Sequence, residues 1–221
     1  MSDFAFTFCD ADLVARPDGT LWWPRKRLLC VSDLHLGKSE RIARRGGTLL
    51  PPYETRETLW RLEAAIAATD PACVVCLGDS FDDLTAADNV SDDARKTLTR
   101  LQAGRDWIWI EGNHDAGPVD IGGTHRGEVV LDRITFRHIT DQATRGEISG
   151  HYHPKAGPTG LPQRACFLLD KVKLILPAFG AYTGGLSVRD PDLSGLMESA
   201  GVAILTGKKA VAVPISACLK R

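Results

Sequence analysis

Short apolar segments recur along the chain and predict buried β-strands. Apolar runs at 28–32, 72–77 and 107–110 are each followed at once by glycine or acidic residues. Strands buried on both faces have this continuous apolar character, and they end where polar residues begin. Apolar and polar residues alternate over 4–8, which is typical of a strand at the edge of a sheet.

Two segments between these strands have the spacing of amphipathic helices. Residues 53–69 place their leucine and isoleucine side chains on one stripe. Ser91 is a residue type that caps helix N-termini, so a second helix is predicted from there to about Ala103. The first half of the chain is therefore predicted to alternate strands and helices.

The second half predicts strands with no helix between them. The candidate strands are 129–137, 147–149, 165–169, 172–176, 202–206 and 210–213. A strand–helix half followed by a strand-rich half favours an α/β (α+β) fold with two facing mixed β-sheets flanked by helices. We expect one domain over 1–221, since a chain of this length is short for two.

Composition and charge narrow the function only slightly. Hydrophobic residues make up 43% of the chain and charged residues 25%, so a buried core is expected and disorder is not. The formal net charge of -1 provides no global basic field for nucleic acid. We expect no signal peptide and no membrane span, and thus a cytoplasmic protein that does not act at a membrane.

Polar clusters follow four of the predicted strands. They are Asp33-x-His35, Gly78-Asp79-x-x-Asp82, Gly112-Asn113-His114-Asp115 and Gly150-His151-x-His153, and His138 follows the strand at 129–137. Ligands of open α/β sheets bind at the carboxyl ends of the strands, so these side chains are expected to meet there.

The residue types in these clusters are those that hold a pair of divalent metal ions. Carboxylate, amide and imidazole groups suit such ions, and Asp79 is the best candidate for a carboxylate shared between them. A lone buried histidine is usually structural. Here five of the six histidines are in the ordered clusters or directly follow the strand at 129–137, which favours a metal site. Asp33 and Asp79 would neutralise only part of the charge of two divalent ions. The remaining positive charge can be balanced by a phosphodiester and a hydroxide.

The ordered clusters resemble those of the calcineurin-like metallophosphoesterase superfamily, from Asp33 to His153. The resemblance implies a four-layer αββα sandwich and two metal sites. One would use Asp33, His35, Asp79 and His153, and the other Asp79, Asn113, His138 and His151. It further implies that His114 stabilises phosphate charge or protonates the leaving oxygen, oriented by Asp82.

A narrower resemblance covers nearly the whole chain. The segments at 21–24, 32–38 and 176–185 resemble the bacterial ligase-associated DNA-damage-response phosphoesterases (PdeM type). This resemblance implies a manganese-dependent phosphodiesterase or nuclease that acts on DNA, functionally associated with a helicase and a DNA ligase. The ligand set itself accepts Mn²⁺, Fe, Zn or Ni.

Several alternatives stay open at this point. His125 competes with His138 as the lone histidine ligand, and Asp115 is expected to be a structural partner and not a catalyst. The first cluster is followed by Lys38, Arg41, Arg44 and Arg45, which form either a basic rim for a nucleic-acid backbone or a solvated helix face. A cyclic-nucleotide phosphodiesterase or a phosphomonoesterase would use the same ligands.

Overall fold

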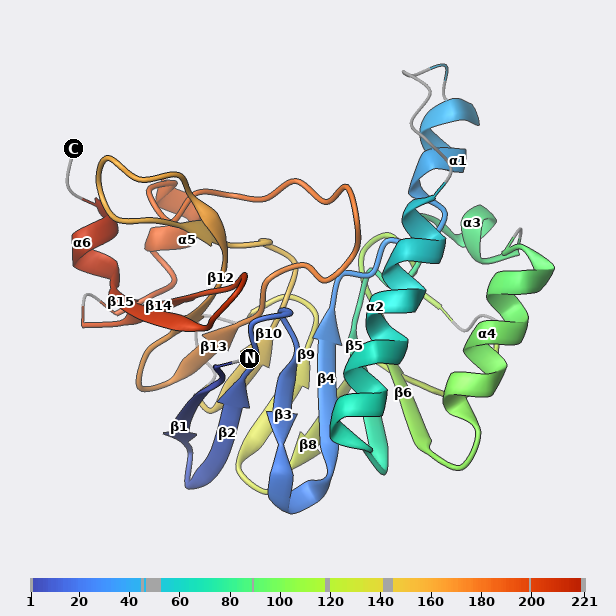
Figure 1. The fold of residues 1–221 in the computed structure, drawn as a ribbon, viewed down its shortest axis with the longest axis horizontal. Coiled ribbons are helices and arrows are strands. Elements are labelled where there is room, and N and C mark those ends of the chain that lie inside the picture. The colour runs from blue at the N-terminus through green and yellow to red at the C-terminus, as the bar shows by residue number, and fades with distance from the viewer. Residues whose placement is uncertain are drawn as a thin grey trace.

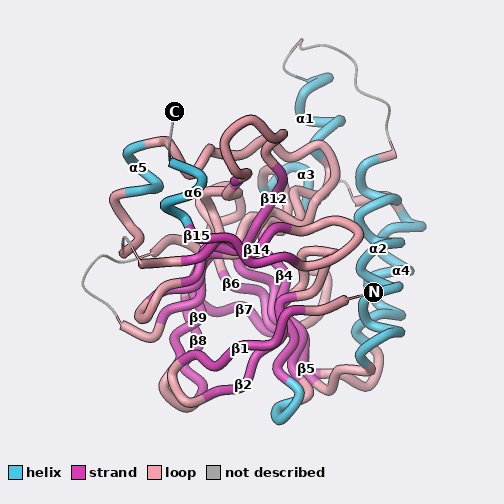
Figure 2. The backbone as a smooth tube through the Cα atoms, turned by 60° about the vertical axis from the view of Figure 1, so that its left-hand side comes forward, coloured by secondary structure: helices cyan, strands magenta, loops and turns pink. Residues whose placement is uncertain are grey.

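Two β-sheets pack face to face at the centre of the protein, and helices lie on their outer sides (Figures 1 and 2). The structure, a computed structural model, describes residues 2–44, 46, 53–88, 90–117, 120–140, 145–198 and 200–219. The layers are those of the predicted αββα sandwich, so this prediction is confirmed.

The first sheet begins antiparallel and becomes parallel. Its strands are, in spatial order, β1 (Phe4–Phe8), β2 (Ala11–Ala15), β3 (Leu21–Trp23), β4 (Leu28–Ser32), β5 (Cys73–Leu77), β6 (Asp106–Ile110) and β7 (Thr124–Arg126). Neighbours from β1 to β4 are antiparallel, and neighbours from β4 to β7 are parallel. The carboxyl ends of β4, β5 and β6 therefore lie at one edge of the sheet.

The second sheet is mixed. Its strands are, in spatial order, β15 (Val211–Pro214), β14 (Val202–Leu205), β12 (Arg164–Leu169), β13 (Lys173–Ile175), β10 (Glu147–Ser149), β9 (Ile134–Arg137) and β8 (Glu128–Leu131), with β11 (Lys155–Ala156) beside β12. Strands β9, β10 and β13 are parallel to one another, and the remaining pairs are antiparallel.

The helices differ in length between the two halves of the chain. They are α1 (Lys38–Arg44), α2 (Glu54–Thr69), α3 (Leu84–Asp88), α4 (Asp92–Gln102), α5 (Pro191–Ser194) and α6 (Ile215–Leu219), with a 3₁₀ turn η1 (Pro24–Lys26) before β4. Helices α2 and α4 run along the first sheet, while α1 rises beyond the ends of its strands (Figure 1). Within the described ranges, none of the helices has the length and apolar character needed to cross a bilayer.

Side chains that alternate along β4 point into two different apolar layers, one on each face of the first sheet. On β4, Leu28 belongs to the cluster between the sheets, together with Phe136 of β9. Its neighbour Leu29 belongs to the cluster between the first sheet and the helices, together with Leu62 of α2. All four are buried, and burial of each leucine contributes roughly 1.5–3 kcal/mol. This packing holds the strand ends in fixed positions.

Most predicted elements are confirmed, and the Ser91 hydroxyl accepts a hydrogen bond from the Ala94 N–H at the start of α4. The predicted strand at 129–137 is wrong, because the chain reverses at Asp132 and forms the hairpin β8–β9. Aspartate tolerates the left-handed backbone that this turn requires. The predicted lack of helices in the second half is also wrong. Helices α5 and α6 contain four and five residues, which is too short for a helical period to show.

Candidate metal centre

The loops after β4, β5 and β10 hold several predicted site residues in a left-handed backbone conformation. Positive φ angles are found at Asp33 (52°), His35 (45°), Asp79 (44°), His151 (70°) and His153 (46°). Such a conformation costs a non-glycine residue about 1–3 kcal/mol, and residues held in it cluster at functional sites. The same loops are joined directly, since the His35 N–H donates to the Asp79 carbonyl over 2.9 Å.

Glycines in these loops permit contacts that no side chain would allow. A Cβ atom on Gly78 would lie 2.4 Å from Cγ of His138, and one on Gly112 would lie 2.2 Å from the backbone nitrogen of Asp79. Both distances are far below van der Waals contact. Gly78 therefore lets His138, from the second sheet, approach the strand ends of the first sheet, and Gly112 lets the loop after β6 approach Asp79.

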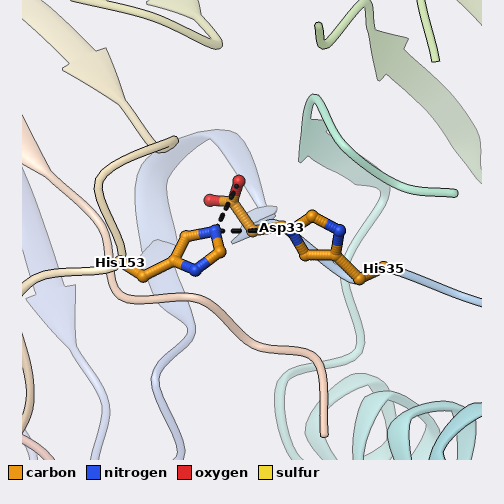
Figure 3. Close-up of side chains that lie close together, drawn as sticks. All are labelled: Asp33, His35 and His153. Atoms are coloured by element: carbon orange, nitrogen blue, oxygen red, sulfur yellow. Dashed lines mark hydrogen bonds and ion pairs between the residues drawn. The ribbon is translucent and has the colours of Figure 1, made fainter. Parts of the chain in front are cut away.

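Asp33, His35 and His153 form the first group of converging side chains (Figure 3). The Nε2 atom of His153 lies 3.2 Å from Oδ1 of Asp33 and 3.4 Å from Nε2 of His35. Asp33 is completely buried, and its Oδ1 makes no hydrogen bond of good geometry among the described residues. Burial raises the pKa of Asp33, but contacts with His153, His138 and Ser32 outweigh it and lower that pKa.

Asp79, Asn113, His138 and His151 form the second group. The Nε2 atom of His138 lies 3.0 Å from Oδ1 of Asn113, 3.3 Å from Oδ2 of Asp79 and 3.3 Å from Nδ1 of His151. Burial lowers the pKa of His138, but Asp79 and Asp33 outweigh it and raise that pKa. Burial and the neighbouring His138 lower the pKa of His151, so the attraction for positive charge in this group comes from the carboxylates of Asp79 and Asp33.

Hydrogen bonds fix which nitrogen of two histidines faces the groups. Nδ1 of His35 donates to Oδ1 of Asp82 over 2.8 Å, and Nδ1 of His138 donates to the Leu77 carbonyl over 2.9 Å. In the neutral rings the lone pairs are then on the Nε2 atoms, which point at other acceptors. The Nε2 lone pair of His138 then faces Oδ1 of Asn113 over 3.0 Å, and two acceptors at this distance repel one another unless a cation lies between them. With the Asp33 oxygen that makes no hydrogen bond of good geometry among the described residues, this arrangement fits divalent metal ions.

Asp79 lies where the two groups meet. Its Oδ2 is 3.3 Å from Nε2 of His138 in the second group and 4.0 Å from Nε2 of His35 in the first. Burial raises the pKa of Asp79, but hydrogen bonds and charges from His138 and His114 outweigh it and hold that pKa far below its usual value. Asp79 is therefore a carboxylate that stays ionised and faces both groups.

Comparison with known sequences agrees with this geometry. A sequence model of calcineurin-like phosphoesterases matches residues 26–175, a span that contains every cluster from Asp33 to His153. The chain belongs to the calcineurin-like phosphoesterase family. It is a metal-dependent phosphoesterase, a hydrolase.

Comparison with solved structures adds a relative over the full length. The crystal structure of nuclease MPE from Pseudomonas putida is similar to this phosphoesterase with a TM-score of 0.76 and 27% sequence identity. The match covers 96% of this chain and 100% of that chain. A comparison with curated proteins found no match.

In this phosphoesterase, His114 contacts the backbone of Asp82 and not its carboxylate. We expected Asp82 to orient His114. Asp82 does contact His114, but through its backbone: Nδ1 of His114 donates to the Asp82 carbonyl over 2.9 Å, and the carboxylate binds His35 and Arg41. The carboxylate is completely buried beneath these two side chains. Nε2 of His114 remains on the side of Asp79, 3.9 Å from Oδ2.

His138 and His125 are the two candidates for the lone histidine ligand, and they lie in different surroundings. His138 follows β9 and belongs to the second group, where it contacts Asn113 and Asp79. His125 lies on β7, and its ring stacks on Trp109 with the centroids 6.4 Å apart. His125 is in none of the metal-binding groups found among the described residues. The tertiary structure therefore favours His138.

The basic residues after the first cluster lie on α1 and are paired with acids. Arg41 contacts Asp82, and Arg44 donates to both oxygens of Asp83 over 3.0 and 3.1 Å. Lys38 is half-buried at the start of the helix, and Arg45 lies outside the described residues. The two alternatives, a basic rim and a solvated helix face, stay open, but Arg41 and Arg44 are paired with acids in either case.

Asp115 ties two of the site loops together. Its buried carboxylate accepts hydrogen bonds from the N–H groups of Asp79, Ser80, Phe81 and Gly112, over 2.7–3.1 Å. This is a structural role, as the sequence suggested. The sequence did not reveal the hydroxyl of Ser32, which donates to Asp33.

Replacement of Asp115 by alanine is expected to destabilise the protein by about 3 kcal/mol or more. Four N–H groups would lose their acceptor, and a buried unsatisfied donor costs roughly 1–3 kcal/mol before relaxation. Urea unfolding of the metal-free protein measures the effect without a contribution from metal binding. Asp106→Ala, at an exposed position on β6, is the control and should change the free energy by less than about 0.5 kcal/mol. Equal stability of the two variants would contradict the structural role.

Proposed function

We propose that the protein is a dinuclear metal-dependent phosphodiesterase or nuclease that hydrolyses phosphodiester bonds. The observation that carries the proposal is the meeting of two converging groups at Asp79. One metal ion would be held by Asp33, His35, Asp79 and His153. The other would be held by Asp79, Asn113, His138 and His151.

Manganese is the metal that we propose for both positions. Mixed nitrogen and oxygen ligands accept Mn²⁺ but also Fe, Zn or Ni, so metal availability contributes to the choice. When bound, two divalent ions acidify a water molecule and stabilise the negative charge of the transition state. The side chains of the protein would fix the positions of both ions, and Asp33 and Asp79, whose pKa values are lowered, would supply negative charge to them.

His114 is the residue that we propose to act on the phosphate or on the leaving oxygen. Its Nδ1–H is held by the Asp82 carbonyl, which only accepts, so Nε2 is the nitrogen left for substrate. In the imidazolium form, this nitrogen can donate to a phosphate oxygen or protonate the departing oxygen. The side chain is 30% exposed, so a substrate can reach it.

DNA is the substrate that we propose, with a role in repair. The full-length relative from P. putida is a nuclease, and the narrower sequence resemblance concerns DNA-damage-response enzymes. A functional association with a helicase and a DNA ligase follows from that resemblance. Lys38, which is half-buried, is the remaining described candidate on α1 for contact with a nucleic-acid backbone.

A small-molecule phosphoesterase is the second candidate, and one observation favours it. Arg41 and Arg44 are paired with Asp82 and Asp83, so these arginines bring little net positive charge to the rim. A polyanion depends on such charge for affinity, whereas a cyclic nucleotide or a phosphomonoester does not.

An activity assay on defined substrates distinguishes these functions. Protein stripped of metal and restored with Mn²⁺ is given single-stranded DNA, nicked DNA, a 2′,3′-cyclic nucleotide and a chromogenic phosphomonoester. We expect cleavage of DNA that stops when the metal is chelated. The variant Asp79→Asn, purified in parallel, excludes a contaminating nuclease. Uncut DNA with cleaved cyclic nucleotide or monoester would favour the second candidate, and no hydrolysis at full metal occupancy would contradict both.

A further inference from the structure

Arg41 of α1 is connected to the proposed metal site through one buried carboxylate. Its Nε atom donates to Oδ2 of Asp82, and Oδ1 of the same carboxylate accepts from Nδ1 of His35 over 2.8 Å. We infer that Arg41 is a positioning residue for metal binding: it holds Asp82 in the orientation that keeps Nε2 of His35 free for a metal ion. This inference rests on the proposed function, since it concerns the same site.

Asp82 requires a cationic partner because its carboxylate is completely buried. A buried carboxylate without compensation is costly, and Arg41 is the cation that contacts it among the described residues. The backbone of Asp82 is fixed independently. Its N–H donates to the Leu36 carbonyl over 3.0 Å, and its carbonyl accepts from His114. The contact with Arg41 therefore determines the orientation of the carboxylate and not the position of the loop.

The orientation of this carboxylate determines the tautomer of His35. While Oδ1 accepts from Nδ1, the lone pair of the neutral ring is on Nε2, which lies 3.4 Å from Nε2 of His153. If the carboxylate turns away, the proton can move to Nε2 and block that position. Loss of partners that orient a ligating histidine typically costs about 10–100-fold in metal affinity.

Helix α1 is anchored so that Arg41 reaches Asp82. The helix begins directly after the loop that contains His35, and its first turn is bound to α2. There Ser39 donates from its N–H and its hydroxyl to the buried carboxylate of Glu54, over 3.2 and 2.7 Å. The Arg41 side chain is 20% exposed, so its contact with Asp82 is largely shielded from water. A substrate phosphate would have to displace Asp82 to bind this guanidinium through Nε.

Arg44 provides a matched control on the same helix. It pairs with an aspartate in the same loop, Asp83, but both side chains are more exposed, at 39% and 25%. Asp83 accepts from Arg44 and from the Ala86 N–H, and among the described residues neither of these partners is a proposed metal ligand. Substitution of Arg44 thus removes a similar ion pair without changing the surroundings of His35.

The test compares Arg41→Gln and Arg44→Gln in the full chain. Titration of the metal-free proteins with Mn²⁺ measures affinity, and ¹⁵N NMR of the histidine rings reports the tautomer of His35. We expect Arg41→Gln to weaken metal binding by about 10–100-fold and to increase the tautomer with hydrogen on Nε2. Arg41→Lys, which keeps the charge, should restore part of the affinity. Arg44→Gln should leave both readouts unchanged.

Other results would overturn the inference in distinct ways. Unchanged metal affinity and tautomer in a folded Arg41→Gln protein, with a raised KM for DNA, would mean that Arg41 binds substrate directly. If Arg41→Gln does not fold, Asp82→Asn carries the test, and unchanged metal affinity and His35 tautomer in that variant would overturn the inference. A wild-type protein that binds no metal would instead remove the proposed function.

Discussion

Asp79→Asn is expected to abolish phosphoesterase activity and to release bound metal. The carboxylate faces both converging groups and is held in its ionised form. Asparagine removes one of the two negative charges, those of Asp33 and Asp79, that would compensate two divalent ions. Metal ions contribute several kcal/mol of transition-state stabilisation, so turnover should fall by roughly 10³-fold or more.

The fold should tolerate this substitution, which makes the result interpretable. The backbone of Asp79 is held by Asp115 and His35 through its N–H and carbonyl groups, which asparagine also has. Elemental analysis after gel filtration measures the retained metal, and hydrolysis of a chromogenic diester with added Mn²⁺ measures turnover. Asp83→Asn, four residues later in the same loop, is the control and should retain metal. If Asp79→Asn keeps two ions per chain, Asp79 is not the shared ligand.

His114→Ala is expected to lower turnover by about 10²–10⁴-fold while metal content stays intact. His114 presents Nε2 beside Asp79 and belongs to neither of the two groups that meet there, although its ring also lies close to His35 and Asp82. Its backbone N–H donates to Oδ1 of Asp79 over 2.9 Å, and alanine preserves that hydrogen bond. The expected loss of turnover should therefore result from removal of the imidazole alone.

The choice of leaving group separates the two proposed roles of His114. A nitrophenolate departs without a proton, so a general-acid role predicts a small loss on chromogenic diesters and a large loss on alkyl or nucleoside esters. Stabilisation of phosphate charge predicts similar losses on both. His125→Ala, which alters the ring that stacks on Trp109, is the control and should retain metal and turnover. Loss of metal in His114→Ala would show that His114 is a ligand.

Local patterns were sufficient to predict most of the elements that carry the site. Strand β4 is apolar at four of its five positions, because it is buried on both faces, and the polar cluster begins where it ends. The hairpin at Asp132 was missed because its flanking residues, Leu131 and Ile134, continue the apolar run through the turn. The short helices α5 and α6 were missed because their positions depend on packing against the second sheet.

The sequence by itself determined the order of the clusters, the residue types of a metal site and the strand ends on which they lie. These features follow from burial and alternation within a few residues, so they are visible without the fold. The tertiary structure placed His138 beside Asn113 and Asp79, directed the Asp82 carboxylate to His35, and paired Arg41 and Arg44 with acids. Each of these outcomes joins side chains from separate elements. Contacts such as Arg41 with Asp82, 41 residues apart, depend on how those elements pack.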